Sequence, residues 1–405
     1  MYLSKYNALV EDFPFEGGVT IYNLITKGLA YVEDKEYLGN LKEIDDDTLL
    51  HMKDNKMVFS SADDEESFIN EFMADKYRTE DKLEITLVTS HACNLKCIYC
   101  FEGESSNEHL TMQKADEIIN EIMSVMAEDR NRELTMRYYG GEPMTNLPVI
   151  DYINARLFAE YGERYSFSIV TNGVLLTKEI IEKWASCNWK GIKITLDGDR
   201  EWTDSRRIAK DGISTYNRVL NNLTILPENI EVFLHIVVDD SNIDHLDHMF
   251  EDLADRGLQE RIVIGISYTH PHINVQPEHR AQIVLKAAQK AKQYGFFLTN
   301  LISIDGEGIC PNKNHNAYLI DIDGKKLKCT GFMSMKDCPE GFYRGSSDKY
   351  NNMDSQCLKC KYLPVCNGGC QFLKVYNKGN KYCQRQYFDA LIPELLKIYI
   401  DYEVE

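Results

Sequence analysis

Three cysteines, Cys93, Cys97 and Cys100, stand within eight residues of one another. Their thiolates can face one metal centre together, because a loop of that length needs only about two turns to wrap it. A structural zinc site normally takes four protein ligands, and no fourth cysteine is nearby, although His91 could serve. A 4Fe–4S cluster on three cysteines instead keeps one iron open to a further ligand. The spacing therefore favours an iron–sulfur centre, with zinc as the alternative.

A denser group of eight cysteines lies beyond residue 300. Two-residue spacings such as that between Cys357 and Cys360 are also typical of zinc ribbons, so zinc competes with iron here as well. The surrounding segment is rich in glycine and asparagine and buries little apolar surface, so we expect metal ligation to hold it together. The eight are Cys310, Cys329, Cys338, Cys357, Cys360, Cys366, Cys370 and Cys383.

The chain carries a formal net charge of −19, from 45 basic and 64 acidic residues. Nucleic-acid-binding proteins show a basic footprint, so this charge argues against that class. No run approaches the ~18 apolar residues of a membrane span, and residues 1–12 lack the pattern of a signal peptide. Twelve cysteines without such a signal indicate metal ligands in a reducing compartment rather than disulfides. We therefore expect a cytoplasmic protein that binds neither nucleic acid nor membrane.

The middle of the chain alternates strand-like runs with amphipathic helical stretches. Six such pairs, between about residues 83 and 293, predict an α/β fold with a parallel sheet and right-handed crossovers. The sheet is either doubly wound or a partial barrel, and in both cases functional side chains gather where the strands end. The expected strands are 83–89, 133–139, 166–171, 191–196, 231–238 and 261–267.

Two flanking regions differ from this core in composition. Residues 1–82 are acidic and contain short apolar runs and one helical stretch, which predicts a small α+β module. Residues 83–300 form the expected core domain. Residues 301–405 form the expected loop-rich C-terminal domain, which ends in a helix over 390–402.

The first cysteine loop resembles the cluster loop of the radical S-adenosylmethionine (SAM) superfamily. Residues 93–101 read CNLKCIYCF, with the aromatic Tyr99 before the last cysteine, and Gly-Gly-Glu-Pro at 140–143 follows the next expected strand. The resemblance implies a partial (β/α)6 TIM-type barrel and an open iron that binds the amino and carboxylate groups of SAM. One electron from the cluster would then cleave SAM to methionine and a 5′-deoxyadenosyl radical.

The same resemblance implies that further residues of this chain contact SAM. Gly140 and Gly141 permit a close backbone approach to a ligand, and the Glu142 carboxylate can accept from an ammonium group. A guanidinium suits a carboxylate, and the resemblance gives that role to Arg207, with Arg206 as its rival. The expected SAM contacts are Tyr99, which packs on the adenine, Gly140, Gly141, Glu142, Pro143, Asn172, Thr195 and Arg207.

The C-terminal cysteines, with Gly324 five positions before Cys329, resemble the SPASM extension of radical SAM enzymes. That extension binds two auxiliary 4Fe–4S clusters with interleaved ligands. In this chain the first auxiliary cluster is one cysteine short, so either Cys338 completes it or one iron stays open. By this resemblance, Cys310, Cys329 and Cys370 would hold the first auxiliary cluster, and Cys357, Cys360, Cys366 and Cys383 the second.

One subfamily with this architecture converts a cysteine or serine of sulfatases to formylglycine, and its base is an aspartate directly after the position of Cys329. This chain has Thr330 there, so sulfatase maturation is the less favoured function. The N-terminal module loosely resembles the leader-binding domain of peptide maturases, which takes its peptide as an added strand. We therefore expect hydrogen abstraction from a precursor peptide, followed by formation of a thioether or a carbon–carbon cross-link.

The resemblance implies two partners, a precursor peptide and an electron donor such as a flavodoxin or ferredoxin. The sequence assigns no general base. A protein that uses its clusters only for binding or redox transfer is the alternative from another class. Such a protein would leave the SAM-gripping motif around Glu142 unexplained.

Overall fold

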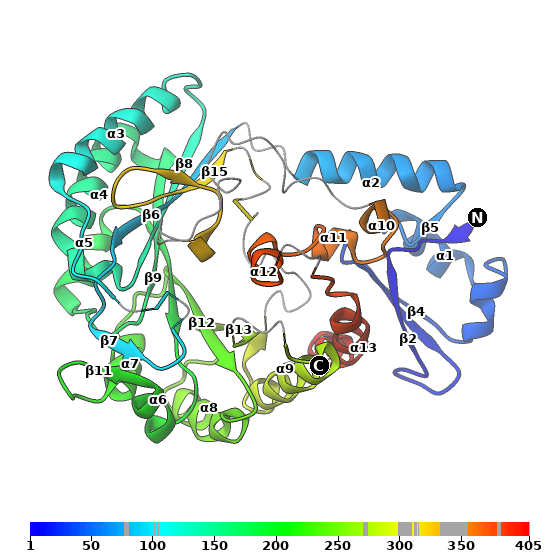
Figure 1. Ribbon diagram of the computed structural model, residues 1–405. Helices are drawn as coiled ribbons and strands as arrows, with labels where there is room; N and C mark the ends of the chain where they lie inside the picture. The colour runs from blue at the N-terminus through cyan, green and yellow to red at the C-terminus, as the bar shows by residue number, and fades with distance from the viewer. Residues whose placement is uncertain are drawn as a thin grey trace.

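The computed structural model places nine strands in one curved sheet (Figure 1). Cys338, the candidate additional ligand of the first auxiliary cluster, lies outside the residues that the structure describes. The described residues are 1–76, 81–100, 102–103, 105–269, 274–298, 310–311, 314, 316–332, 355–378 and 382–404.

Six strands of the sheet follow one another in space in the same order as in the chain. Each is parallel to its neighbours in this set. A doubly wound sheet reverses its strand order at a switch point, whereas a barrel does not. The predicted partial (β/α)6 barrel is therefore confirmed. The six are β6 (Lys82–Ser90), β8 (Glu133–Gly140), β9 (Tyr165–Thr171), β10 (Trp189–Thr195), β12 (Glu231–Val238) and β13 (Ile262–Tyr268).

Helices cover the outer face of this sheet, as Figure 1 shows for α3, α4 and α5. Their apolar side chains recur at helical spacing, so that Ala115, Ile118 and Ile119 of α3 are all buried. The Thr111 hydroxyl caps this helix by accepting from the Lys114 N–H. No helix in the described ranges is both long and apolar enough to cross a membrane. The outer helices are α3 (Met112–Met126), α4 (Leu147–Tyr161), α5 (Lys178–Ala185), α7 (Thr215–Thr224), α8 (Leu246–Ala254) and α9 (Pro277–Gln293).

The strands send apolar side chains toward the helices and more polar ones toward the barrel interior. In β12, Val232, Leu234 and Ile236 are buried in the core, whereas Phe233 and His235 line an interior cavity. The two-residue period of a strand produces this separation, because successive side chains point to opposite faces. The barrel therefore encloses a cavity with partly polar walls.

Three short strands extend the sheet beyond these six. At one edge, β14 (Phe297–Leu298) pairs in parallel with β13. At the other edge, β15 (Ala317–Ile320) pairs in parallel with β6, and β16 (Lys326–Leu327) pairs antiparallel with β15. Because Cys329 follows β16 by two residues, this extension carries a C-terminal cysteine to the barrel.

The first 76 residues have a core of their own, in which Val19 and Ile21 pack with Leu49 and Met52. Three antiparallel strands and a second, two-stranded sheet of β1 with β5 surround this core. The elements are β1 (Tyr2–Leu3), β2 (Asn7–Glu11), β3 (Val19–Asn23), β4 (Leu29–Val32), α1 (Asp46–Asp54), β5 (Val58–Phe59) and α2 (Ala62–Lys76).

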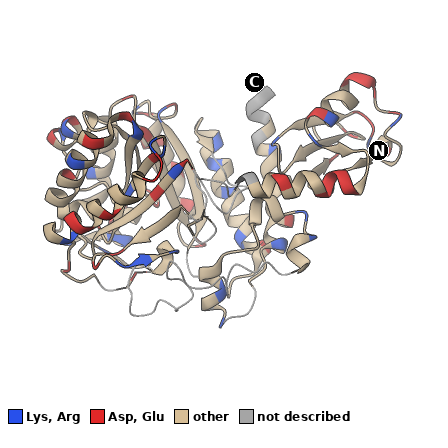
Figure 2. Ribbon diagram, turned by 90° about the horizontal axis from the view of Figure 1, so that it is seen from above, with Lys and Arg blue, Asp and Glu red and all other residues tan. Residues whose placement is uncertain are grey.

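The last helix joins the three parts of the molecule. Leu391 and Leu395 of this helix belong to the barrel core, while Phe388 and Ile392 pack in a cluster with Val10 of the N-terminal module. In Figure 2 the described part of this helix accordingly lies between the barrel and the N-terminal module. Three short helices precede it. The elements are α10 (Ser355–Leu358), α11 (Leu363–Cys366), α12 (Gln371–Tyr376) and α13 (Arg385–Val404).

Candidate functional site

The barrel encloses a cavity of about 2610 Å³. It runs along the strands, from residues near their starts, such as Glu84, to residues at their ends, such as Thr195. The structure thus brings the first cysteine group and three C-terminal cysteines to one space. The cysteines that line it are Cys93, Cys97, Cys100, Cys310, Cys329 and Cys370.

A two-stranded antiparallel ribbon fixes the first cysteine loop. Strand β7 (Leu95–Cys97) pairs with β11 (Arg207–Ala209), which puts Cys97 opposite Arg207. The Ile98 N–H also donates to the Arg206 carbonyl at 2.9 Å. Leu95 is 3% exposed and packs into the barrel core. Backbone pairing and apolar burial therefore position this loop independently of any metal.

The thiols of this loop stand in partly buried surroundings. Burial raises the pKa of Cys93 to about 11, and it also raises the pKa of Cys97 and of Cys100. A metal centre would supply the positive charge that such thiols need in order to ionise. The Leu95 N–H donates to Cys93 Sγ at 3.4 Å, and Asn172 Nδ2 lies 3.9 Å from the same sulfur. These donors suit a thiolate, so the loop fits a metal cluster.

The two glycines after β8 allow its backbone to approach the cysteine loop. A Cβ on Gly140 would stand 2.2 Å from the Ser90 carbonyl oxygen, and one on Gly141 would stand 2.8 Å from the Ala92 carbonyl oxygen. In place of those side chains, the Gly141 N–H donates to Ser90 and the Glu142 N–H donates to Ala92. Both glycines also line the cavity. The backbone at these glycines therefore lies close to the segment that leads into Cys93, while the expected close approach to a ligand stays a prediction.

The Glu142 side chain is fully buried and faces the strand ends. Its Oε1 accepts from the Met144 N–H at 3.0 Å and from the Thr171 hydroxyl at 2.7 Å, and its Oε2 accepts from the Asn172 N–H at 2.7 Å. Burial raises the pKa of this carboxyl, and these donors oppose the rise. Neither Glu142 nor Pro143 lines the cavity. Glu142 thus holds neighbouring strand ends together, and its expected direct contact with an ammonium group stays a prediction.

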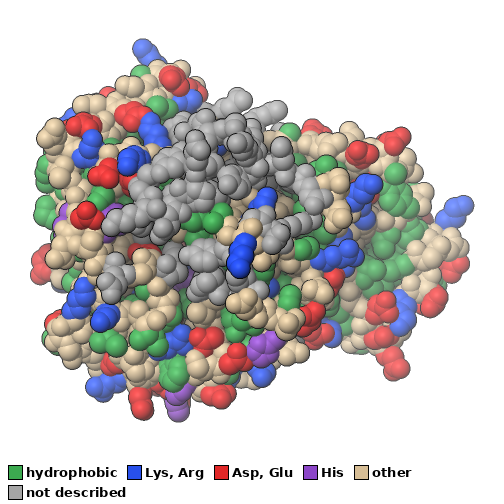
Figure 3. All heavy atoms as spheres, in the orientation of Figure 1, with side chains coloured by type: hydrophobic (Ala, Val, Ile, Leu, Met, Phe, Trp, Pro, Cys, Tyr) green, Lys and Arg blue, Asp and Glu red, His purple; other side chains and the backbone are tan. Residues whose placement is uncertain are grey.

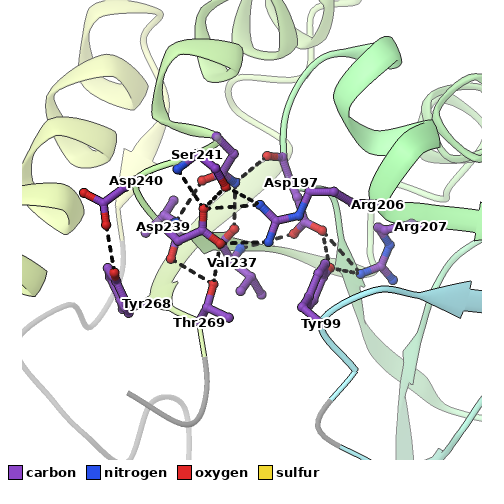
Figure 4. Close-up of polar contacts among 12 residues, drawn as sticks. Tyr99, Asp197, Arg206, Arg207, Val237, Asp239, Asp240, Ser241, Tyr268 and Thr269 are labelled. Carbon is purple, nitrogen blue, oxygen red and sulfur yellow. Dashed lines mark hydrogen bonds and ion pairs between the residues drawn. The ribbon is translucent and has the colours of Figure 1, made fainter. Parts of the chain in front are cut away.

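Three side chains from different elements meet beside the cysteine loop (Figure 4). The Tyr99 hydroxyl donates to Asp197 Oδ2, and Arg207 Nη1 lies 2.6 Å from the Tyr99 oxygen and 3.6 Å from Asp197 Oδ2. Burial raises the pKa of Tyr99, which keeps the phenol protonated. Arg207 lines the cavity, and its buried Nε has no hydrogen-bond partner within the described part of the chain. A buried donor of this kind fits an anionic ligand such as a carboxylate.

The neighbouring Arg206 points to a different partner (Figure 4). Its Nη2 lies 2.9 Å from Asp239 Oδ2, and its guanidinium stacks 4.7 Å from the centre of the Tyr99 ring. Burial alone would raise the pKa of Asp239, but hydrogen bonds from Arg206 and Ser241 outweigh it and lower the pKa to about 2. Arg206 is therefore committed to this ion pair, and Arg207 is the arginine that faces the cavity.

The seven described C-terminal cysteines fall into two places. Three of them line the large cavity, and the other four line a separate cavity of about 30 Å³ beside α10 and α11. This division is the same as the ligand pairing that the family resemblance implies, although the pairing itself stays a prediction. Within the described ranges, no group of three or more His, Cys, Asp or Glu side chains is arranged to hold a single metal ion. The four in the small cavity are Cys357, Cys360, Cys366 and Cys383.

Sequence reasoning missed Asp197 and the ribbon partner of the cysteine loop. Asp197 is 0% exposed and receives the Tyr99 hydroxyl. A signal was present, because Asp197 comes two positions after the end of β10, and functional side chains of such barrels gather just after the strand ends. The segment 207–209 gave no such signal, since three residues are too few for a periodic pattern.

Comparison with known proteins finds one matching family model and several relatives. Residues 87–253 match the model of the radical SAM superfamily. Over 460 aligned positions, covering 98% of this chain and 94% of the relative, the chain is 23% identical to the radical SAM cyclopropyl synthase TigE of Paramaledivibacter caminithermalis. It is also 23% identical to a serine-type anaerobic sulfatase-maturating enzyme of Bacteroides thetaiotaomicron, over 69% of this chain and 80% of that enzyme.

Two solved structures share the fold. Streptococcus suis SuiB bound to its precursor peptide SuiA superposes with a TM-score of 0.53 and 14% identity, over 95% of this chain and 98% of SuiB. The enzyme anSMEcpe with bound AdoMet superposes with a TM-score of 0.60 and 15% identity, over 79% of this chain and 97% of that chain. At these identities the likeness establishes the fold alone.

Proposed function

Because this chain is a radical SAM enzyme, which uses a 4Fe–4S cluster and SAM, we propose that it is a maturase that oxidatively cross-links a precursor peptide. The observation that carries this proposal is the shared cavity, which two cysteine groups face together. Its volume of about 2610 Å³ exceeds the roughly 300–1,000 Å³ typical of small-molecule pockets. The additional volume can hold a peptide segment beside SAM.

The first cluster is assigned to Cys93, Cys97 and Cys100. When bound there, the cluster and SAM supply the radical that abstracts hydrogen from the substrate. Arg207 offers its unpaired Nε to the SAM carboxylate, and the amide of Asn172 and hydroxyl of Thr195 border the same space. Tyr99 is the contact for the adenine. Glu142 acts as a positioning residue, because its carboxylate orients the strand ends through three hydrogen bonds.

The C-terminal cysteines are assigned to two auxiliary clusters in a domain that spans residues 301–405. The first would use Cys310, Cys329 and Cys370 beside the substrate space, where an oxidised cluster can accept the second electron of the cross-linking reaction. Its remaining iron would be ligated by Cys338 or by the substrate. The second would use the four cysteines of the small cavity and stabilise the loop-rich domain.

The peptide substrate is supported by the relatives that span nearly the whole chain. SuiB is described with a bound precursor peptide, and TigE is named a cyclopropyl synthase. A cyclopropyl ring consists of carbon–carbon bonds, so a carbon–carbon product takes precedence over a thioether in this proposal. The antiparallel strands of residues 1–82 offer an edge to which a leader segment could add as a further strand.

Sulfatase maturation is the second candidate, because a sulfatase-maturating enzyme is among the relatives. Thr330 stands where that reaction needs a carboxylate, and it lines the cavity directly after Cys329. A threonine hydroxyl is a poor proton acceptor at neutral pH. The peptide cross-link therefore accounts better for this site.

The test uses anaerobically reconstituted protein, SAM, dithionite and, as the candidate substrate, the peptide of any short open reading frame found beside the gene. We expect 5′-deoxyadenosine and a peptide that has lost the mass of two hydrogen atoms and does not react with a hydrazide. A hydrazide-reactive product from a sulfatase-derived serine or cysteine peptide would establish formylglycine formation instead. A Cys93/Cys97/Cys100→Ala variant is the control, and it should lose about four of about twelve irons and all SAM cleavage.

A further inference from the structure

Arg137 points into the barrel from the middle of β8. Successive side chains of a strand face opposite ways, so Met136 and Tyr138 are buried in the barrel core. Arg137 stands between them, lines the large cavity and is solvent-exposed there. It forms no hydrogen bond or ion pair with any residue that the structure describes. Its guanidinium is therefore presented to whatever occupies the cavity.

The outer surface differs, because cations there have acidic neighbours. Figure 3 shows acidic and basic side chains interspersed over one face of the molecule. Lys183 lies 2.6 Å from Asp151, and Arg218 lies 2.8 Å from Asp211. Opposite charges attract each other more strongly in a cavity with less water than at such a surface. Arg137 is thus suited to bind an anionic group that enters the barrel.

The neighbours of Arg137 in the sheet suit a carboxylate. Thr86 of β6 and Ser168 of β9 lie beside it in register, and both line the cavity. A carboxylate can take two parallel hydrogen bonds from a guanidinium, and its remaining lone pairs can accept from hydroxyl groups. Lys193 of β10 adds positive charge to the same cavity, with its Nζ 4.9 Å from the centre of the Phe233 ring.

We propose that Arg137, flanked by Thr86 and Ser168, binds a carboxylate of the substrate peptide. The carboxylate comes from an aspartate or glutamate side chain or from the C-terminus of the peptide. The inference rests on the proposed function, since it requires a peptide in the barrel cavity, and it narrows the substrate class to peptides with such a group. No bond forms or breaks at this subsite, which selects and orients the substrate.

The position of Arg137 along β8 predicts how the peptide is oriented. Arg137 comes three residues before Gly140, the last residue of the strand, which is about 10 Å at the rise of a β-strand. Glu84 lines the cavity beside Thr135, nearer the start of β8, and repels a carboxylate on that side. The peptide therefore extends from Arg137 toward the strand ends. An extended chain covers this distance in about three residues, so we expect the modified residue about three positions from the carboxylate.

The test uses the reconstituted full chain with SAM and two pools of short synthetic peptides of random sequence. One pool has free C-termini and the other has amidated C-termini, and mass spectrometry identifies the peptides that the chain retains. Arg137→Gln removes the charge, whereas Arg137→Lys keeps the charge but loses the planar fork. The matched control is Arg130→Gln, because Arg130 is exposed in the turn before β8 and does not line the cavity.

We expect the wild type and the control to retain peptides that share a carboxylate. Acidic peptides retained from both pools would assign this group to a side chain, and retention confined to free C-termini would assign it to the terminus. Replacing the carboxylate of a retained peptide by an amide should raise the Kd for the wild type about tenfold or more. The same replacement should change the Kd for Arg137→Gln about twofold or less, and Arg137→Lys should lie between the two.

Several outcomes would overturn the subsite. These are the retention of no peptide, retention without a carboxylate preference, an equal amide effect in the wild type and Arg137→Gln, and an equal loss in Arg130→Gln. Because the amide replacement is made in the peptide, the wild type still tests the preference if a variant does not fold. A failure of the proposed function is a separate result, in which the wild type forms no 5′-deoxyadenosine from SAM and dithionite while the peptide preference is still measured.

Discussion

The first cysteine group and the four cysteines of the small cavity are held in different ways. Cys97 belongs to a ribbon whose base is buried in the barrel core, next to strands of seven to nine residues. Cys357 and Cys366 instead belong to α10 and α11, which have four residues each. Helices this short are not stable on their own, because forming the first helical turn fixes several backbone dihedral angles for a single hydrogen bond. Packing thus sets the geometry of the first site. The second site also has buried neighbours, Tyr362 and Val365, but we expect ligation to contribute more to its geometry than to that of the first.

Removal of iron is the most direct test of this difference between the two cysteine sites. With a chelator and a reductant, we expect amide hydrogens in 355–384 to lose about 5 kcal/mol or more of protection, because metal binding is folding free energy where the core is small. Strands β6 to β13 should keep their protection. Hydrogen exchange followed by mass spectrometry of both regions makes the measurement.

Equal losses in the barrel strands and in 355–384 would contradict the comparison, since the first site would then depend on its cluster as well. The Cys93/Cys97/Cys100→Ala variant separates the two contributions. It should unfold at nearly the wild-type denaturant concentration, because the ribbon and Leu95 remain in place.

The Glu142→Ala variant tests how far polar contacts support the barrel site. It would leave the N–H groups of Met144 and Asn172 buried without an acceptor, and the cost of such groups predicts a loss of about 3 kcal/mol in unfolding free energy. Urea unfolding measures the loss. Glu142→Gln retains one carbonyl acceptor in the same volume and should recover part of it. Wild-type stability in Glu142→Ala would show that these hydrogen bonds do not hold the strand ends.

Much of the barrel site could be predicted from the sequence, because its residues follow periodic strands. Cys93, Gly141, Asn172 and Thr195 each come just after or at the end of an expected strand, so their meeting follows from parallel topology. The pairing of β7 with β11 could not be predicted. It joins segments about 110 positions apart through three residues each, and no local pattern encodes so short a ladder.

Beyond residue 300 the sequence predicted less of the structure. The expectation of a loop-rich domain with a final helix did not include β15, which adds to β6 in parallel. The local partner of this four-residue strand is the two-residue β16, and its apolar run alone does not reveal that it also pairs with β6. The expected role of Cys338 stays a prediction, because that residue lies outside the described part of the chain.

The Gly141→Ala variant tests whether close backbone packing sets the geometry of the first cysteine site. The new Cβ would stand 2.8 Å from the Ala92 carbonyl oxygen, so the segment that leads into Cys93 must shift. Overpacking of this kind costs about 2 kcal/mol. We expect a lower thermal midpoint together with loss of iron from the first site only. Gly39→Ala is the matched control, because Gly39, like Gly141, has no positive φ but has no atom near its Cβ position. Equal iron loss in both variants would contradict the prediction.

The smallest expected effect concerns the ion pair between Arg206 and Asp239. The pKa of Asp239 is lowered to about 2 from an ordinary value of 3.8, so its contribution to stability is fully present above about pH 4. That contribution is lost as the pH falls toward 2, because the carboxylate then takes up a proton and releases the guanidinium. Partial solvent exposure limits the effect to about 1 kcal/mol.

Arg206→Gln should therefore be less stable than the wild type at pH 6, and the difference should shrink as the pH falls from 4 to 2. Urea unfolding of protein prepared without iron–sulfur clusters, at several pH values, measures this stability difference. Because Arg206 also stacks on Tyr99, Arg206→Lys keeps the charge and tests the stacking separately. A stability difference that does not change with pH would assign the role of Arg206 to stacking, and the barrel site would then rely on aromatic packing where we infer an ion pair.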